Sequence, residues 1–152
     1  MFTIKRRFTC KVISLFLVIF FVFQIPVLAN AAEPIQPRAS DYLSVYSAYV
    51  YVTPAGEVQI WFDVMGTGDM DEIGTLSIML YESSDGINWT WLKTFRHEAD
   101  EGMLFYDDWY VSSHVSYPNG STTKQYKAYV GIWAGKNGDG DTRYFWAYQP
   151  HL

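Results

Sequence analysis

Cysteine is almost missing from this sequence. The 152 residues contain one, Cys10, and it stands before the longest apolar run rather than after it, where a lipoprotein cysteine would be found. The remainder of the chain has no thiol, so we expect neither a disulfide nor a cysteine nucleophile in the folded domain. The domain must then be stabilised by its hydrophobic core alone.

Recognisable catalytic motifs are also missing. The three histidines, His97, His114 and His151, show no metal-ligand spacing, and the chain has no G-x-S-x-G or H-E-x-x-H motif. Asp107 and Asp108 are adjacent carboxylates, but neighbours on a strand point to opposite faces and cannot act as a facing pair. We therefore expect a protein without catalytic residues and without a cofactor, and not an enzyme.

The N-terminal segment is typical of a secretory signal peptide. An apolar run over residues 12–28 is followed by Ala29-Asn30-Ala31, which suits cleavage before Ala32. An uncleaved anchor helix is the alternative, but a membrane-spanning helix needs roughly 20 apolar residues, and this run is shorter and contains Pro26. We expect residues 1–31 to be removed and the protein to be secreted, with no membrane contact after cleavage. The basic residues ahead of the run are Lys5, Arg6, Arg7 and Lys11.

Basic residues are scarce in what would remain. Cleavage would leave 121 residues with seven Lys or Arg and 16 Asp or Glu, a net charge of −9. That charge argues against nucleic acid or an anionic membrane as a partner. The length suits one β-sandwich and is too short for two ordinary domains. We expect residues 32–40 to form an extended leader and residues 41–152 to form the domain.

Aromatic residues are plentiful, and they follow a strand period. All 6 Trp and 12 Tyr lie after residue 31, and segments of alternating apolar and polar residues are separated by turn signals. The clearest segment, residues 76–95, predicts a hairpin with a tight turn at Asp85-Gly86. The expected strands are residues 42–53, 57–65, the two arms of that hairpin, 103–115, 124–134 and 142–148. Loops are expected at residues 66–73, 97–102 and 135–141.

Seven short strands favour a single antiparallel β-sandwich, immunoglobulin-like or fibronectin-III-like. A small closed barrel is the alternative, since strand number does not distinguish the two. Tyr126 follows a turn and begins a long strand, as the tyrosine of a tyrosine corner does. The strand over residues 103–115 is expected to bend near Asp107-Asp108.

Several segments resemble small secreted proteins of unknown function in Gram-positive bacteria. These are the basic and hydrophobic leader, the glycine-acid loop, SSDGINWTWLKTF at residues 83–95 and YKAYVGIWA at residues 126–134. The resemblance covers the part after the leader and implies secretion and an immunoglobulin-like or fibronectin-III-like β-sandwich. It implies no activity, because that family has none assigned.

In an immunoglobulin-like topology, the loops at residues 66–73, 97–102 and 135–141 would gather at one pole. They carry nine acidic or amide side chains, and flexible oxygen-rich loops are what Ca²⁺ requires. Residues 137–141 begin like an EF-hand but fail at position six, Thr142, and at position twelve, Tyr148. The alternative is that solvated loops of an acidic protein are simply acidic. The candidate metal ligands are Asp69, Asp71, Asp139 and Asp141.

A second candidate site is aromatic. If Ala128, Val130 and Ile132 point inward, the aromatic residues that alternate with them point outward. Outward aromatic residues of the neighbouring strands would then share the outer face of the same sheet. Sugar rings stack on such surfaces, and exposed apolar patches mark binding sites. Two alternatives remain: the aromatic pairs stabilise the sheet by roughly 0.2–1 kcal/mol each, or a one-residue slip reverses the last strand. The candidate ligand-binding residues are Tyr81, Tyr129, Trp133, Tyr144 and Trp146.

These observations predict a secreted, non-catalytic binding domain that recognises a glycan or an extracellular protein through the aromatic face. The alternative function is a structural surface domain whose acidic loops are stabilised by Ca²⁺.

Overall fold

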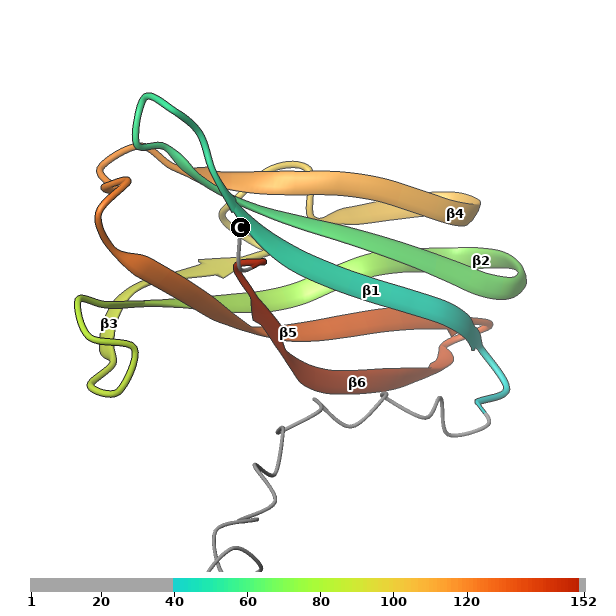
Figure 1. Ribbon diagram of the computed structural model, residues 1–152. Helices are drawn as coiled ribbons and strands as arrows, with labels where there is room; N and C mark the ends of the chain where they lie inside the picture. Colours follow the sequence, from blue (N-terminus) through green and yellow to red (C-terminus); the bar gives the residue numbers. More distant parts are fainter. Residues whose placement is uncertain (1–39, 151–152) are drawn as a thin grey trace, which may run out of the picture. The chain divides into compact units, whose positions relative to one another are not determined.

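A computed structural model describes residues 40–150, which form six strands joined by short turns (Figure 1). Every strand pair is antiparallel, so the expected all-β antiparallel fold is confirmed. The predicted signal peptide and most of the predicted leader lie outside the described residues. The strands are β1 (Leu43–Val52), β2 (Val58–Ser83), β3 (Thr90–Arg96), β4 (Leu104–Tyr117), β5 (Gln125–Lys136) and β6 (Asp139–Tyr148).

Strand β2 is the centre of the sheet. The sheet order is β1-β2-β5-β6, and β3 and β4 also pair with β2. The first half of β2 pairs with β1 up to Gly66, whereas the second half pairs with β5 from Glu72 onward. Figure 1 shows β2 turning back on itself between these halves. The prediction of a loop between two strands at residues 66–73 is therefore wrong. These residues form the corner of one continuous strand.

Strand β4 turns at the same end of the sheet. Met65 pairs with Tyr110 and Met70 with Asp108, so four residues of β2 face a single residue of β4. Asp107 adopts a left-handed backbone with φ of 55°, a conformation that Asp tolerates better than most residues. The expected bend near Asp107-Asp108 is confirmed. Because both strands turn together, the sheet curls over and its two halves enclose the core (Figure 1).

The core consists of alternate side chains from both halves of the curled sheet. Phe62 from the first half of β2 and Ile78 from the second half are fully buried. Tyr46 of β1 meets Phe145 of β6 with ring centroids 5.4 Å apart, although these two strands do not pair. The described residues thus form one curled six-stranded sheet, and a seven-strand immunoglobulin-like or fibronectin-III-like sandwich is not confirmed.

Two connections differ from the sequence-based expectation. The β5–β6 turn is only Asn137-Gly138, with φ of 56° and 80°, the two positive φ values of a type I′ hairpin turn. The β2–β3 connection is longer than the expected Asp85-Gly86 turn, since it includes residues 84–89. The carboxylate of Asp85 organises it by accepting hydrogen bonds from the backbone N–H groups of Ile87 and Asn88, at 2.9 and 2.8 Å.

Tyr126 supports the turn that precedes β5. Its side chain is only 1% exposed, and its hydroxyl accepts a hydrogen bond from the backbone N–H of Ser121 at 2.7 Å. A buried phenol whose oxygen contacts backbone a few residues upstream is the feature that a tyrosine corner predicts.

Replacing Tyr126 with Phe should lower the free energy of unfolding by roughly 1–3 kcal/mol, because the Ser121 N–H loses its partner in a partly buried turn. Chemical denaturation of the variant would measure the loss. Tyr148→Phe, at a tyrosine that is 57% exposed, is the matched control and should leave stability unchanged. Equal stability of both variants would show that the hydrogen bond does not hold the turn.

Asp85 should make the protein sensitive to acid. Hydrogen bonds from Asn88, Ile87 and Ser83 hold the pKa of the Asp85 carboxyl well below its usual value of 3.8. A lowered pKa in the folded state stabilises the fold above the usual pKa, and that contribution is lost as the pH falls below about 4. Melting temperatures measured between pH 5 and pH 2.5 should therefore fall less for Asp85→Asn than for the wild type. Glu101→Gln controls for the loss of one charge, and parallel curves for the wild type and Asp85→Asn would contradict the prediction.

Candidate functional site

The outer face of β2, β5 and β6 carries the predicted aromatic surface. The strand register places Tyr129 between Met79 of β2 and Trp146 of β6. Tyr144 is 54% exposed and Trp146 is 38% exposed, whereas Ala147 between Trp146 and Tyr148 is buried. Tyr144, Trp146 and Tyr148 of β6 therefore point outward, as the sequence predicted, and the reversed register is not found.

These rings form one connected group. Tyr129 lies at the centre, with ring centroids 5.8 Å from Tyr144 and 5.0 Å from Trp146, and Trp146 is 5.5 Å from Tyr81. The Nζ atom of Lys127 lies 4.4 Å from the ring centroids of both Trp89 and Trp146, within the range of a cation–π interaction. We call this group the outer aromatic cluster: Tyr81, Trp89, Lys127, Tyr129, Tyr144 and Trp146.

Gly131 allows the cluster to lie close to the sheet. It pairs with Tyr144 across the β5–β6 ladder, and a Cβ atom at this position would lie 2.5 Å from Cε1 of Tyr144. No Cβ makes so close a contact, so the Tyr144 ring occupies the space that a side chain on β5 would fill. Sequence reasoning did not identify Gly131 as part of the surface, although its position among the outward residues of the alternating YKAYVGIWA segment is a signal that it could have used.

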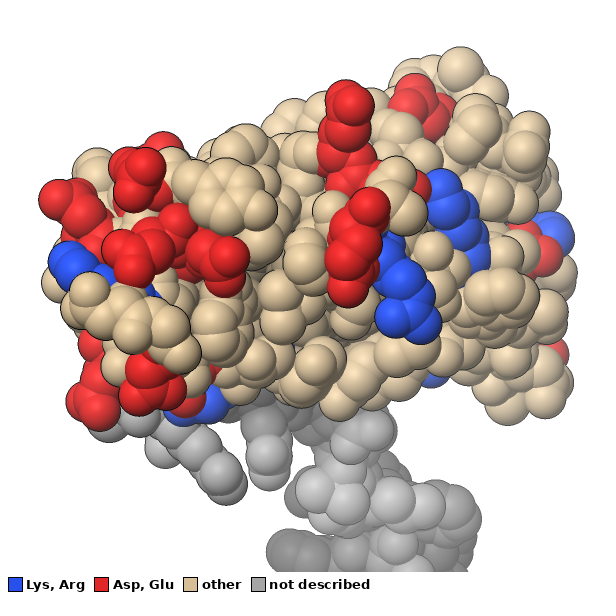
Figure 2. All heavy atoms as spheres, turned by 180° about the vertical axis from the view of Figure 1, so that it is seen from behind, with Lys and Arg blue, Asp and Glu red and all other residues tan. Residues whose placement is uncertain are grey.

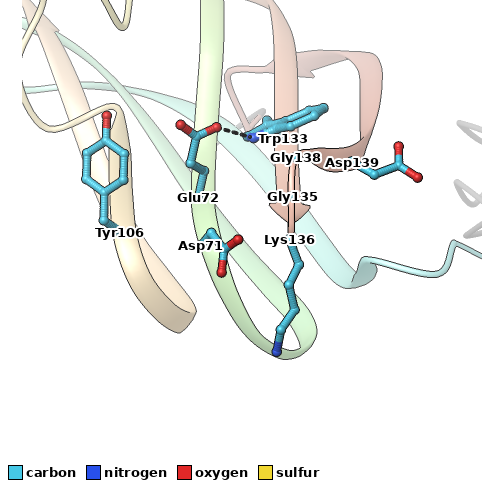
Figure 3. A pocket seen from close by; sticks show the side chains of 8 residues that line it. All are labelled: Asp71, Glu72, Tyr106, Trp133, Gly135, Lys136, Gly138 and Asp139. Carbon is cyan, nitrogen blue, oxygen red and sulfur yellow. Dashed lines mark hydrogen bonds between the residues drawn. The ribbon is translucent and has the colours of Figure 1, made fainter.

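Trp133 lies apart from the cluster on the same face of β5. Its indole Nε1 donates a hydrogen bond to Oε2 of Glu72 at 3.2 Å, and no ring contact joins it to the cluster within residues 40–150. It forms one wall of a hollow of about 350 Å³ (Figure 3). Of the five predicted ligand-binding residues, the structure brings together four and leaves Trp133 in this separate hollow. The residues that line the hollow are Asp71, Glu72, Tyr106, Trp133, Gly135, Lys136, Gly138 and Asp139.

Two glycines make room for the Trp133 ring beside the hollow. Tyr106 of β4, Glu72 of β2, Gly135 of β5 and Gly140 of β6 lie side by side in consecutive ladders. A Cβ atom at Gly135 or at Gly140 would come within 2.5 Å of the Trp133 ring. The indole therefore lies over Gly135 and Gly140, and its Nε1 donates a hydrogen bond to the Glu72 carboxylate.

Figure 2 shows Asp and Glu side chains gathered at one end of the domain. The predicted calcium ligands lie on β2 (Asp69 and Asp71) and on β6 (Asp139 and Asp141). They bond to different partners: Asp71 accepts from the Asn137 N–H at 2.6 Å, and Asp141 accepts from Arg143 at 3.2 Å and also from Ser40. Asp139 accepts from the Gly140 N–H at 2.9 Å, and the Asp69 carbonyl accepts from Lys136. In the described part of the chain, no three acidic or histidine side chains are arranged to hold a metal ion.

The ionisation of Tyr42 reflects the acidity of this end. Burial raises the pKa of the Tyr42 hydroxyl, and the hydrogen bond and negative charge of Asp139 raise it further. The charges of Asp41 and Asp141 act in the same direction. The end of the domain next to the hollow is therefore electrostatically negative.

A second aromatic row lies on the outer face of β1, β2 and β4 and was not predicted from the sequence. Trp61 stacks on His114 with centroids 4.3 Å apart and is nearly parallel to Tyr49 at 6.5 Å. His114 therefore covers one face of the Trp61 ring. Tyr49, Trp61 and His114 are neighbours only because β1 and β4 both pair with β2 in this register. Alternation within each strand does not show which strands pair.

The residues considered for catalysis do not meet. His114 belongs to the stacked row, His97 lies 3.2 Å from Glu98, and the carboxylate of Asp108 accepts from the backbone N–H of Trp109 at 2.8 Å. His151 lies outside the described residues. Between residues 40 and 150 there is also no helix with the length and hydropathy required to cross a membrane.

Gly135→Ala should displace the Trp133 ring, because the new Cβ would overlap it. We expect a changed tryptophan emission spectrum and a loss of roughly 1–3 kcal/mol in unfolding free energy, the usual cost of overpacking. Gly68→Ala is the matched control, since a Cβ there meets nothing within 4 Å. An unchanged spectrum for Gly135→Ala would show that Trp133 is not seated on the glycines.

Comparison with known proteins gives no family. No protein-family model matches the chain, and no curated protein matches it. Among solved structures, the chain is similar to the sporulation control protein Spo0M from Bacillus subtilis, at 12% identity and a TM-score of 0.37, over 70% of this chain and 49% of Spo0M. It is also similar to a putative late embryogenesis abundant protein, at 16% identity and a TM-score of 0.38, over 95% and 87% of the two chains. The chain thus spans about half the length of Spo0M, and neither likeness is strong enough to assign a function.

Proposed function

We propose that this protein is a secreted, non-catalytic glycan-binding domain whose outer aromatic cluster contacts the sugar rings. The observation that carries the proposal is the cluster itself: rings from β2, β5, β6 and the β2–β3 connection join on one sheet face, where the two rings of β6 stay exposed and the others are half-buried. Tyr144 is 54% exposed and Trp146 is 38% exposed although each contacts Tyr129. Secretion rests on the predicted signal peptide.

The geometry of the rings favours sugars on this face. Trp146 is tilted by 48° from Tyr129 and by 59° from Tyr81, so these rings do not cover one another completely. Aromatic faces accept the C–H surfaces of sugars, and tyrosine hydroxyls can bond to sugar hydroxyls. On the opposite face, the Trp61 ring stacks on His114 with centroids 4.3 Å apart and within 20° of parallel, so one face of Trp61 is covered.

The chemical character of the patch suits a glycan. The cluster consists of Trp and Tyr rings, which have polar atoms at their edges, together with one lysine. An extracellular protein is the other partner that an exposed patch of this kind can serve. The strongly negative charge predicted for the secreted form disfavours nucleic acid and anionic membranes.

Calcium does not enter the proposal. Asp71 and Asp141 already bond to Asn137 and Arg143, and no observation on the described residues favours Ca²⁺ at this end. Calcium-stabilised loops remain an expectation from the sequence, which calcium-dependent thermal unfolding would test.

Trp146→Ala should weaken glycan binding at least tenfold, a change of about 1.4 kcal/mol in binding free energy, because Trp146 joins Tyr81 and Tyr129 in the cluster. The measurement is a screen of the purified protein against a glycan array and insoluble cell-wall polysaccharides, followed by titration of the best ligand.

Trp61→Ala is the matched control for that experiment, because it removes the same side chain from the opposite face and should leave binding unchanged. Thermal unfolding would establish that both variants are folded. If no glycan binds the wild type, or if Trp146→Ala binds like the wild type, the proposal is wrong, and a protein partner becomes the better candidate.

A further inference from the structure

We infer that the hollow beside Trp133 is a subsite for a protonated amine, so that the glycan recognised is one that carries free amino sugars. This inference rests on the proposed glycan binding and names the class of glycan. It comes from three features of the hollow: its shape, its uncompensated carboxylates and its position on the same strand as the outer aromatic cluster.

The hollow combines a recess with aromatic walls. The Trp133 indole and the Tyr106 ring border the space of about 350 Å³, and Gly135 and Gly138 add no side chains to its lining (Figure 3). Tyr106 is 65% exposed, so the space is open to a ligand from solvent. An ammonium group close to an indole or phenol face gains a cation–π interaction.

The carboxylates around the hollow have no cationic partner. Asp71, Glu72 and Asp139 take part in no ion pair among the described residues, whose four ion pairs lie elsewhere. The one lysine on the rim, Lys136, instead donates to the backbone carbonyl of Asp69 at 2.8 Å. The lining therefore carries three negative charges and one positive charge, and a bound cation would reduce the mutual repulsion of the carboxylates.

Glu72 is held in a position that suits this role. Its Oε2 atom accepts the hydrogen bond from the Trp133 indole at 3.2 Å, and this bond fixes the carboxylate beside the ring. A carboxylate has more acceptor positions than one such bond uses. An ammonium group could thus bond to Glu72 while it contacts the Trp133 ring.

The position of the hollow connects it to the cluster. Tyr129 and Trp133 both point outward from β5, separated by four residues, which corresponds to about 13 Å along a strand. A linear oligosaccharide lying along β5 would contact the cluster with some of its rings and the hollow with another. The hollow would then distinguish an amino sugar from its N-acetylated form, which has no charge.

Oligomers of β-1,4-linked glucosamine and of N-acetylglucosamine provide the test, because they share a backbone and differ in the charged amine. Titration calorimetry of the purified full chain should show at least tenfold tighter binding of the deacetylated oligomer. The double variant Asp71→Asn/Glu72→Gln should lose that preference and keep the affinity for the acetylated oligomer. Trp146→Ala should weaken the binding of both.

The double variant Glu57→Gln/Glu101→Gln is the matched control, since it removes the same charge away from the hollow and should keep the preference. Equal affinity of the wild type for both oligomers, or a preference that survives Asp71→Asn/Glu72→Gln, would overturn the amine subsite while leaving glycan binding intact. A preference lost equally in the control variant would also overturn it, because net charge would then explain the effect. A wild type that binds neither oligomer but does bind another glycan would refute the inference alone, whereas failure to bind any glycan would refute the proposed function as well.

Discussion

The fold depends on one long strand, β2, that runs through both halves of the curled sheet. β2 contributes to both halves of the curled sheet, so its side chains must alternate correctly before and after the corner at residues 66–69. A strict two-residue alternation along the whole of β2 would not keep the apolar side chains inward in both halves. The register with β5 shifts at Leu76, where one additional residue reverses the facing direction, as a β-bulge does. Because of this shift, Thr75 and Ile78 are both buried, and Glu72, which lies before the bulge, faces the hollow.

Glycine and aromatic residues are used together on the outer face of β5 and β6. Three glycines on these strands, Gly131, Gly135 and Gly140, would each place a Cβ within 2.5 Å of an aromatic ring. Glycine in a strand interior usually weakens a sheet because it packs nothing and loses more entropy on folding. Here the neighbouring rings fill the vacant positions. This pairing of glycines with aromatic rings thus stabilises the sheet and fixes the positions of the Tyr144 and Trp133 rings.

The sequence was informative where alternation is strict and uninformative where the register shifts. It predicted the strands, the outward direction of Tyr144 and Trp146, and the bend near Asp107, because each depends on local pattern. It did not predict that residues 66–73 continue β2, since glycines and acids in a corner look like a loop. Strict alternation would place Trp91 and Phe95 on one face, whereas a bulge between their partners on β2 leaves Trp91 56% exposed and Phe95 buried. The hollow and the stacked row of Trp61 require strand partners, which one sequence does not provide.

A rigid strand beneath the proposed binding surface would lower the entropy cost of binding. Tyr129 and Trp133 are carried by β5, which is paired on both sides by β2 and β6, so their separation does not have to be ordered when a ligand arrives. Lys127 restrains Trp89, the cluster residue from the β2–β3 connection, by lying between it and Trp146. Immobilising a flexible side chain on binding costs about 0.5–1.5 kcal/mol, and rings that are already in contact avoid part of that cost. Under the proposed function, such a surface favours a ligand that is itself extended and stiff, as a linear polysaccharide can be and a disordered peptide is not.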